Sequence, residues 1–238
     1  MHADFEAILN WRLLAGSHPF PGPDGGTCIN EAAIVAAGLP YRTIRSSADC
    51  PPCFSRPIAA YALGLNDAMP DVARPQLMAF VLRLSGSADT PEIEAARTRL
   101  LALESIRRIL APLCALADMA EHAEACAGAP DLPAALAAAH GASWAGGVRS
   151  QAAAQRRRWR EGAVTAAVAR TATAAQQAGT DARCAAEVAE GAAPFLPGMW
   201  AQACAILDAA LAIGRQAPEI ALAGARERLD AARAGAPA

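Results

Sequence analysis

Residues 24–37 read DGGTCINEAAIVAA and decide the local fold of the N-terminal part of the chain. Two glycines precede an apolar run, which predicts a helix over Cys28–Ala37 that ends before Gly38. This helix lies within residues 17–67, a segment that also contains a Gly/Pro-rich loop and a Cys-Pro-Pro-Cys turn at residues 50–53. The candidate functional residues of the chain gather in this segment.

Composition predicts the fold class. Alanine, leucine, glutamate and arginine are frequent, lysine is absent, and aromatic residues make up 5% of the chain. These are good helix formers, so we expect an all-α irregular helical bundle with a Gly/Pro-rich loop region near the N-terminus and an alanine-rich C-terminal part. Proline, glycine and capping residues predict helices over residues 4–14, 28–37, 55–67, 71–84, 90–112, 116–127, 132–140, 195–213 and 218–232, with Pro112 kinking or breaking its helix.

Glycines at 141–147 suggest a domain boundary. We expect a helical domain over residues 1–140 and an alanine-rich arm over residues 148–238, whose last helices (197–232) pack back on the first domain. Residues 151–192 are poor in large apolar side chains, so this part either packs closely on a neighbour or stays partly mobile.

Charge and hydropathy limit the possible partners. The net charge of -2 gives no field that would recruit nucleic acid, and no apolar run is long enough for a membrane span. The N-terminus lacks the pattern of a signal peptide, and the seven cysteines do not suggest a small disulfide scaffold. We therefore expect a cytoplasmic protein with reduced thiols, no resident cofactor and no nucleic-acid or membrane partner. A homo-oligomer is possible.

The predicted helix start at Cys28 has two interpretations. Glycines before a helix let backbone amides converge on an anion, and the helix dipole lowers the pKa of a thiol. The site would then bind an anionic ligand or use Cys28 as a nucleophile. In the alternative, the segment is an ordinary capped helix with a buried cysteine. The residues that would form the ligand cradle are Asp24, Gly25, Gly26, Thr27, Asn30 and Glu31.

Further polar residues follow in the same segment. Arginine forks recognise phosphate and carboxylate groups, so we include Arg42, Arg45 and Arg56 in the candidate ligand site. Asn66 and Asp67 close the segment and complete this set. Alternatively these residues form a structural network, in which Arg42 and Arg56 pair with Glu31 and Asp67.

Three interpretations remain open for Cys50-Pro51-Pro52-Cys53. Two cysteines at this spacing are half of a zinc site or a redox pair, but no second such motif follows and the prolines remove N–H donors. The third interpretation is a rigid proline turn with packed thiols.

The basic run QRRRWR at residues 155–160 is interpreted mainly as a solvated helix face. In that arrangement Arg156 and Arg160 would share one side of a helix beside Trp159, where they could also touch phosphates.

Two resemblances accompany these patterns. Cys28 followed by Gly38-Leu39-Pro40-Tyr41-Arg42 resembles the nucleophile region of transglutaminase-like thiol enzymes. That family draws its His and Asp from downstream β-strands, which the sequence does not predict here. The pattern PGPDGGTCINEAA (residues 21–33), CPPCFSRP (50–57) and LND (65–67) resembles one in uncharacterised bacterial and prophage proteins, with a further likeness over residues 210–216. It implies no activity, but it suggests that the two ends of the chain belong to one unit.

Three hypotheses for function follow. The first is a non-enzymatic binding protein that recognises a small anionic ligand or a protein partner through the loops of residues 17–67. The second is an enzyme with Cys28 as nucleophile or with a zinc or redox site at Cys50 and Cys53. The third is a structural protein that self-associates through its alanine-rich helices.

Overall fold

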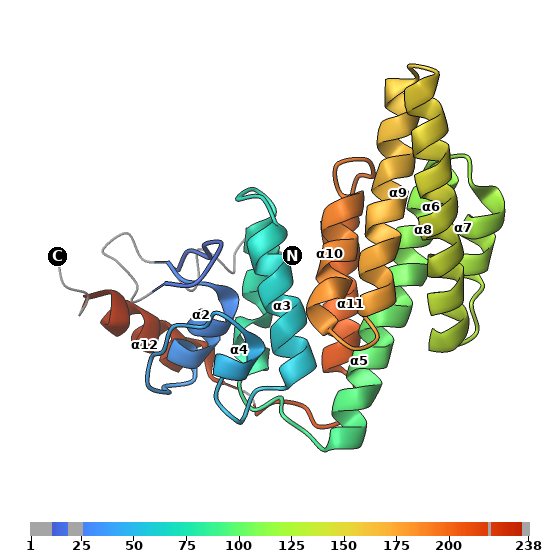
Figure 1. Cartoon of the computed structure of the whole chain (residues 1–238). Coiled ribbons are helices and arrows are strands. Elements are labelled where there is room, and N and C mark those ends of the chain that lie inside the picture. The colour runs from blue at the N-terminus through green and yellow to red at the C-terminus, as the bar shows by residue number, and fades with distance from the viewer. Residues whose placement is uncertain (1–10, 19–25, 219, 235–238) are drawn as a thin grey trace. The chain divides into compact units, whose positions relative to one another are not determined.

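The computed structural model describes residues 11–18, 26–218 and 220–234. This described part is all-α, as predicted, and its extended residues pair only as two isolated bridges. None of its helices combines the length and apolar character that a membrane span requires. Figure 1 shows the elements, which are α2 (Ile29–Ala36), η1 (Ser47–Asp49), α3 (Arg56–Ala68), η2 (Arg74–Phe80), α4 (Val81–Leu84), α5 (Pro91–Ser105), η3 (Ile106–Leu110), α6 (Ala111–Leu116), α7 (Ala120–Ala127), α8 (Leu132–Gln155), α9 (Trp159–Gln177), α10 (Ala182–Ala192), α11 (Met199–Leu211) and α12 (Leu222–Ala234).

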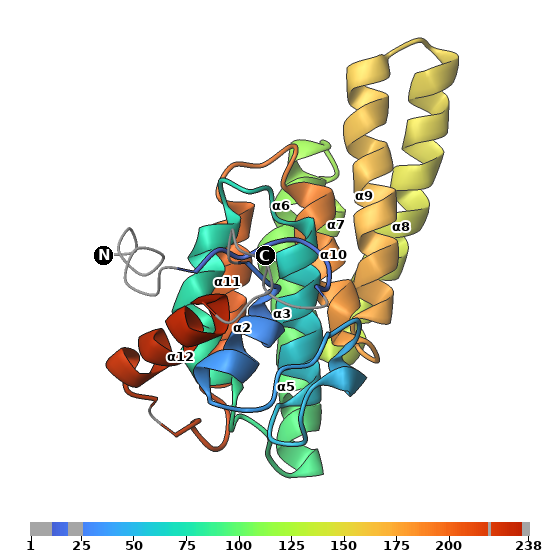
Figure 2. The same ribbon diagram turned by 90° about the vertical axis from the view of Figure 1, so that its left-hand side faces the viewer.

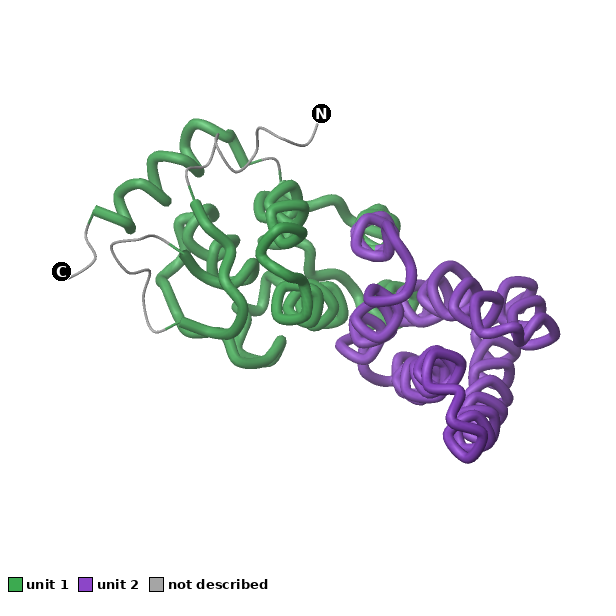
Figure 3. Tube along the Cα trace, turned by 90° about the horizontal axis from the view of Figure 1, so that it is seen from above, with its two compact units in different colours: residues 1–97, 207–238 green, residues 98–206 purple. Residues whose placement is uncertain are grey.

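The chain forms two compact units (Figure 3). Unit 1 comprises residues 1–97 and 207–238, and unit 2 comprises residues 98–206, so both ends of the chain belong to unit 1. The boundary predicted at residues 141–147 differs from this division, because these residues lie inside α8. A glycine in a helix costs only about 1 kcal/mol relative to alanine, so a helix continues through it where packing supports the turn.

Helix α2 is the centre of unit 1. Helices α3, α4 and α12 all pack against it (Figure 1), and every residue of α2 is buried. The C-terminal helix α12 also satisfies the end of α2, because Nε of Arg228 donates to the carbonyl of Ala36 at 2.7 Å. Large buried side chains complete this core, among them Ile29, Ile34, Ile44, Phe54, Ile58, Tyr61, Leu65, Met69, Leu77 and Met78.

The residues before α2 are extended, which corrects part of the predicted first helix. Residues 4–10 of that helix lie outside the described part of the chain, but residues 11–14 are not helical. Trp11 and Leu13 are buried while Arg12 between them is exposed, which is the alternation of a strand. Leu13 forms a bridge with Thr27, and Nε1 of Trp11 donates to the Thr27 hydroxyl at 3.1 Å.

Two predicted helices contain irregular turns. In place of the single helix expected over residues 71–84, the structure has the 3-10 turn η2 followed by the short helix α4. Asp71, which was predicted to cap that helix, instead forms an ion pair with Arg74 at 2.5 Å. Pro112 was expected to kink or break its helix, and the π-helical turn η3 lies directly before it. Proline lacks the N–H of a regular turn, and a wider turn accommodates this. The helix then continues as α6.

Helices α8 and α9 form the hairpin of unit 2, side by side in Figures 1 and 2. Their contact depends on small residues: a Cβ on Gly146 would lie 2.9 Å from the Thr165 carbonyl oxygen and 3.0 Å from the Ala169 nitrogen. Alanine buries little area, so it stabilises a helix pair chiefly by close approach of the backbones. Residues 151–192 were expected either to pack closely on a neighbour or to stay partly mobile, and the structure shows them closely packed.

The basic run lies in the turn between α8 and α9, which corrects its interpretation as one helix face. Helix α8 ends in a Schellman motif: Arg158 N donates to the Ala153 carbonyl at 2.8 Å and Arg157 N to that of Ala154 at 3.0 Å. Arg157 accordingly has φ +57°, a position that glycine usually fills. Arg156 is the C-terminal cap of α8 and Arg160 is the second residue of α9, so they share no helix face.

Adjacent glycines in α8 provide a matched test of the close packing. Gly147→Ala should stabilise the protein by about 1 kcal/mol, because alanine favours the helix and no atom lies within 4 Å of the added Cβ. Gly146→Ala should destabilise it by about 1–3 kcal/mol, because backbone atoms of α9 must move. Urea unfolding of both variants measures the difference, and equal effects would contradict the described α8–α9 contact.

Candidate functional site

The start of α2 already contains an anion of the protein's own, the carboxylate of Glu31. Glu31 is fully buried, and its Oε2 accepts from Cys28 N at 3.0 Å. Its Oε1 accepts from His18 N at 3.1 Å and from Ile44 N at 2.9 Å. A carboxylate at the third helical position commonly returns to the N–H of the capping residue. The N–H groups that could have bound an external anion are therefore partly occupied by Glu31.

Asn66 and Asp67 act in the same structural way. Oδ1 of Asn66 accepts from Ile29 N at 3.2 Å, and its Nδ2 donates to the Leu14 carbonyl at 2.8 Å. Oδ1 of Asp67 accepts from Gly16 N at 2.9 Å. The C-terminal turn of α3 thus fixes both α2 and the extended segment before it. Within the described residues, these two side chains contribute to the scaffold of the predicted site.

Cys28 has the environment of an inert thiol. It is fully buried, and burial raises its pKa well above the ordinary value, with the nearby Glu31 charge adding to the shift. A nucleophilic cysteine needs a lowered pKa and access for its substrate. The partial positive charge of the helix start does not offset the burial and the Glu31 charge, which both raise the pKa of Cys28. The geometry therefore favours the capped helix with a buried cysteine.

The other residues of the predicted cradle are divided between backbone contacts and the undescribed part of the chain. Nδ2 of Asn30 donates to the Ala59 carbonyl at 3.0 Å, and the Thr27 hydroxyl donates to the Cys28 carbonyl at 3.0 Å. A Cβ on Gly26 would lie 2.6 Å from Leu14 Cδ1 and 3.1 Å from the Arg12 carbonyl oxygen, so a larger residue there would displace the Leu14 side chain. Asp24 and Gly25 lie outside the described residues.

The three predicted arginines gather around the short turn η1, and we name Arg42, Arg45 and Arg56 the arginine cluster. Nη1 of Arg42 donates to the Asp49 carbonyl at 3.1 Å. Nη1 of Arg56 donates to the Cys50 carbonyl at 2.7 Å and to the Ser47 carbonyl. Arg42 and Arg56 thus bond main-chain carbonyls, which corrects the predicted pairing with Glu31 and Asp67. All three side chains are exposed.

Arg45 differs from the other two arginines of the cluster. Its backbone N–H donates to Oδ2 of Asp49 at 3.0 Å, and Ser46 N donates to the same oxygen at 2.8 Å. These backbone bonds lower the pKa of Asp49 below its ordinary value, so its charge is kept for the turn itself. The Arg45 guanidinium forms no hydrogen bond or ion pair with the described residues. Its positive charge nevertheless contributes to lowering the pKa of Asp49.

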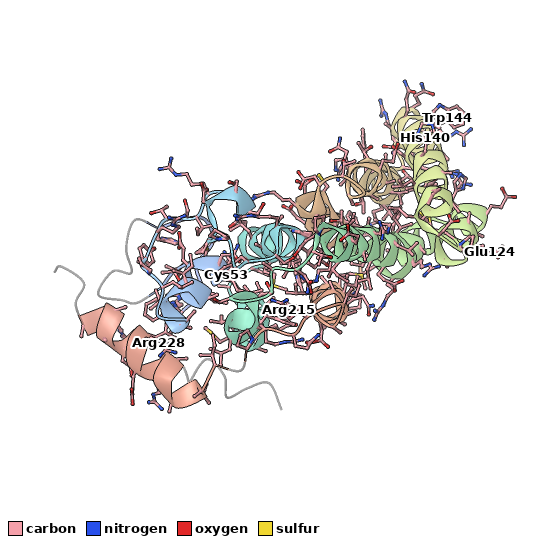
Figure 4. The ribbon with its side chains drawn as sticks, turned by 90° about the horizontal axis from the view of Figure 1, so that it is seen from below. Cys53, Glu124, His140, Trp144, Arg215 and Arg228 are labelled. Atoms are coloured by element: carbon pink, nitrogen blue, oxygen red, sulfur yellow. The ribbon has the colours of Figure 1, made fainter. Side chains whose placement is uncertain are left out.

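Cys50 and Cys53 do not form a metal centre with the described residues. Cys50 is buried, and burial raises its pKa to about 12. Cys53 is half-buried and lies on unit 1, where Figure 4 labels it, with its Sγ 3.8 Å from the Ser85 hydroxyl. No group of three His, Cys, Asp or Glu side chains in the described part of the chain is placed to hold a metal ion. The geometry of Cys50 is that of the packed proline turn.

Sequence reasoning missed a completely buried cation of unit 1, Arg97. Its side chain is completely buried, and it donates to the Ser87 carbonyl at 2.6 Å and to the Ile213 carbonyl at 2.8 Å. It also pairs with Glu94 at 3.2 Å. Arg97 therefore joins α5 to two loops of unit 1. Its place four residues before the buried Leu101 is a signal that it lies on the inner helix face.

Comparison of the chain with family models, curated proteins and solved structures gave no match.

Replacing the central carboxylate tests its structural role. Glu31→Gln should lower the free energy of unfolding by about 2–3 kcal/mol, because an amide nitrogen cannot accept the N–H bonds that the carboxylate accepts. Denaturant unfolding measures the loss. Glu227→Gln, at an exposed glutamate of α12, is the matched control and should change stability little. Similar stability of both variants would show that the three backbone bonds contribute nothing.

The thiols should react in an order set by burial. At about neutral pH, iodoacetamide should modify Cys53 before Cys28 and Cys50. The rise in the pKa of Cys50 from 9.0 to about 12 lowers its thiolate fraction about a thousandfold. Peptide mass spectrometry after timed quenching gives the order, and the urea-unfolded protein controls for intrinsic reactivity. Fast modification of Cys28 in the folded protein would support the nucleophile hypothesis instead.

Proposed function

We propose that this protein acts by binding, and that the arginine cluster recognises an anionic group, a carboxylate or phosphate. A small molecule or a protein partner could carry that group. The observation that supports this proposal is the gathering of three exposed guanidinium groups around the single turn η1. Guanidinium groups bind carboxylate and phosphate oxygens through parallel N–H donors.

Pre-organisation favours the arginine cluster over an ordinary solvated surface. Arg42 and Arg56 are each oriented by main-chain carbonyls of residues 47–50, so part of the entropy cost of fixing these side chains is met in the free protein. Arg45 completes the set with a guanidinium that has no hydrogen bond or ion pair among the described residues. Asp49 is the acid of the turn, and its carboxylate is engaged by two backbone N–H groups.

Binding suits the described chemistry better than the thiol enzyme. The pKa of the Cys28 thiol is raised and its side chain is buried, whereas the arginine cluster is exposed to any ligand. The whole chain carries a net charge of -2, so the attraction would be local and would suit a single anionic group better than nucleic acid. The seven free cysteines accord with a cytoplasmic protein, which we also propose.

Arg45 gives the cleanest test, because its loss removes no described hydrogen bond of its side chain. Arg45→Gln should weaken anion binding about tenfold, the value of one charge-assisted hydrogen bond of about 1.5 kcal/mol. Calorimetric titration at constant ionic strength would use two probes: inorganic phosphate and a peptide rich in aspartate and glutamate. Binding of phosphate indicates a small-molecule site, and binding of the peptide alone indicates a protein partner.

An exposed arginine elsewhere controls for net charge. Arg99→Gln, in α5, changes the total charge equally and should leave the affinity for either probe unchanged. Equal loss in both variants would reduce the effect to general electrostatics, and failure of the wild-type protein to bind either probe would overturn the proposal.

A further inference from the structure

The outward face of α8 carries no acid, arginine or lysine. Every one of its outward positions is exposed, and they follow one another at intervals of three or four residues along the whole helix. We name this set the α8 stripe, and its members are Pro133, Ala137, His140, Trp144, Val148, Gln151 and Gln155.

The α8 stripe is unusual for a solvent-exposed helix face. Outer faces of soluble helices are normally charged, yet the single residue of the Asp/Glu/Lys/Arg group in α8 is Arg149, which lies off the stripe. Nη1 of Arg149 donates to the Asp118 carbonyl at 2.8 Å and to the carbonyl of Ala117, the C-terminal cap of α6, at 3.4 Å. The exposed fractions of Trp144 (72%) and Val148 (49%) are high for apolar side chains. Figure 4 labels His140 and Trp144 next to each other on this helix.

Trp144 lies at the centre of the α8 stripe, and the other positions are arranged symmetrically about it. Residues 140 and 148 are four positions away, residues 137 and 151 seven, and residues 133 and 155 eleven. A helix that runs antiparallel with the same sequence therefore presents the same positions in register. Trp144 meets Trp144, Val148 meets His140, and Gln151 meets the smaller Ala137.

Because the two ends of α8 carry opposite charges, we infer that the occupant of the α8 stripe is a second copy of the chain, packed antiparallel through α8 with Trp144 at the twofold axis. A twofold interface uses the same patch on both copies, and each residue pair then occurs twice. The central contact is an aromatic pair, which contributes beyond its buried area. The α8 stripe shares no residue with the arginine cluster, so the inference is independent of the proposed function.

Charge at the ends of α8 favours the same antiparallel arrangement. The basic turn Arg156–Arg158 follows the last residue of α8, and the exposed Asp131 precedes the first. Antiparallel pairing centred on Trp144 brings the basic turn of one copy beside Asp131 of the other. A parallel pair would instead place the two basic turns together, and like charges repel.

The size of the α8 stripe predicts a dimer that dissociates on dilution. A helix of 24 residues is about 36 Å long. One helix face of this length gives less area than the roughly 800 Å² per partner of a standard stable interface. We therefore expect monomer and dimer to interconvert within the accessible concentration range.

Sedimentation of two tryptophan variants tests where the copies meet. Trp144→Ala should raise the dimer dissociation constant at least about tenfold, because the central anchor is lost. Trp159→Ala is the matched control: this tryptophan is 69% exposed and belongs to α9, outside the stripe, so the constant should not change. A wild-type monomer throughout, from about micromolar to about millimolar protein, would overturn the inference. Equal effects of both variants would also overturn it.

Crosslinking tests the register. A mixture of the Ala137→Cys and Gln151→Cys proteins, treated with a short bismaleimide, should give a covalent heterodimer. Each variant alone should not crosslink, because identical positions lie about 21 Å apart in the antiparallel pair. The wild-type protein controls for reaction at the half-buried Cys53. Crosslinking of each variant alone, without the heterodimer, would indicate a parallel pair and contradict the symmetry argument.

Discussion

The packing of the loops in unit 1 depends on the hydrogen bonds that the buried carboxylate of Glu31 accepts. A buried charge is costly unless several donors surround it, and here three backbone N–H groups from separate segments point at two oxygens. These bonds fix His18, the start of α2 and Ile44 relative to one another. Tyr41 and Thr43 then donate to the His18 carbonyl at 2.7 Å and 3.0 Å and extend the network. The loops are thus held in place by a charge inside them.

The sequence could predict the parts of the fold that local residues specify. Ser55, with Pro57 behind it, marks the start of α3, and Thr90-Pro91 marks that of α5, as the structure confirms. Capping and proline signals act within one turn, so they are readable from neighbours alone. Cys28 is a local partner of Glu31, but its other two bonding partners lie 13 residues away on either side, at His18 and Ile44. No local pattern indicates them.

In the candidate site too, the contacts between residues that are distant in the sequence could not be predicted. The sequence places many polar residues within residues 17–67, and several of the described ones have hydrogen-bond partners inside that segment. The sequence did not reveal which of them bond the backbone and which remain free. Asn66 and Asp67 resemble ligand-binding residues in the sequence, but each has a backbone N–H as its partner. A polar residue near a glycine-rich loop is equally consistent with both roles until the fold is known.

In this lysine-free chain, several arginine side chains donate to main-chain carbonyls at or near the C-terminal ends of helices. Helices leave unpaired carbonyls at their C-terminal ends, and a protein of many short helices has many such ends. Arg228 donates to the end of α2, Arg149 to the end of α6, and Arg74 to the Asn66 carbonyl at 2.8 Å in the last turn of α3. The guanidinium fork suits this task, because it presents several donors in fixed directions and stays charged.

The number of donors that bond main-chain carbonyls distinguishes the arginines that stabilise the fold from those that we propose bind a ligand. Arg97 is fully buried and its donors are directed to carbonyls, so it has no capacity for a ligand. Arg42 and Arg56 have one nitrogen each on the backbone and keep the rest of the fork exposed. The guanidinium of Arg45 forms no hydrogen bond within the part of the chain that the structure describes. The bonds of Arg42 and Arg56 to main-chain carbonyls stabilise the turn that carries Arg45. In the arginine cluster, arginine side chains therefore both stabilise the turn and provide the proposed binding groups.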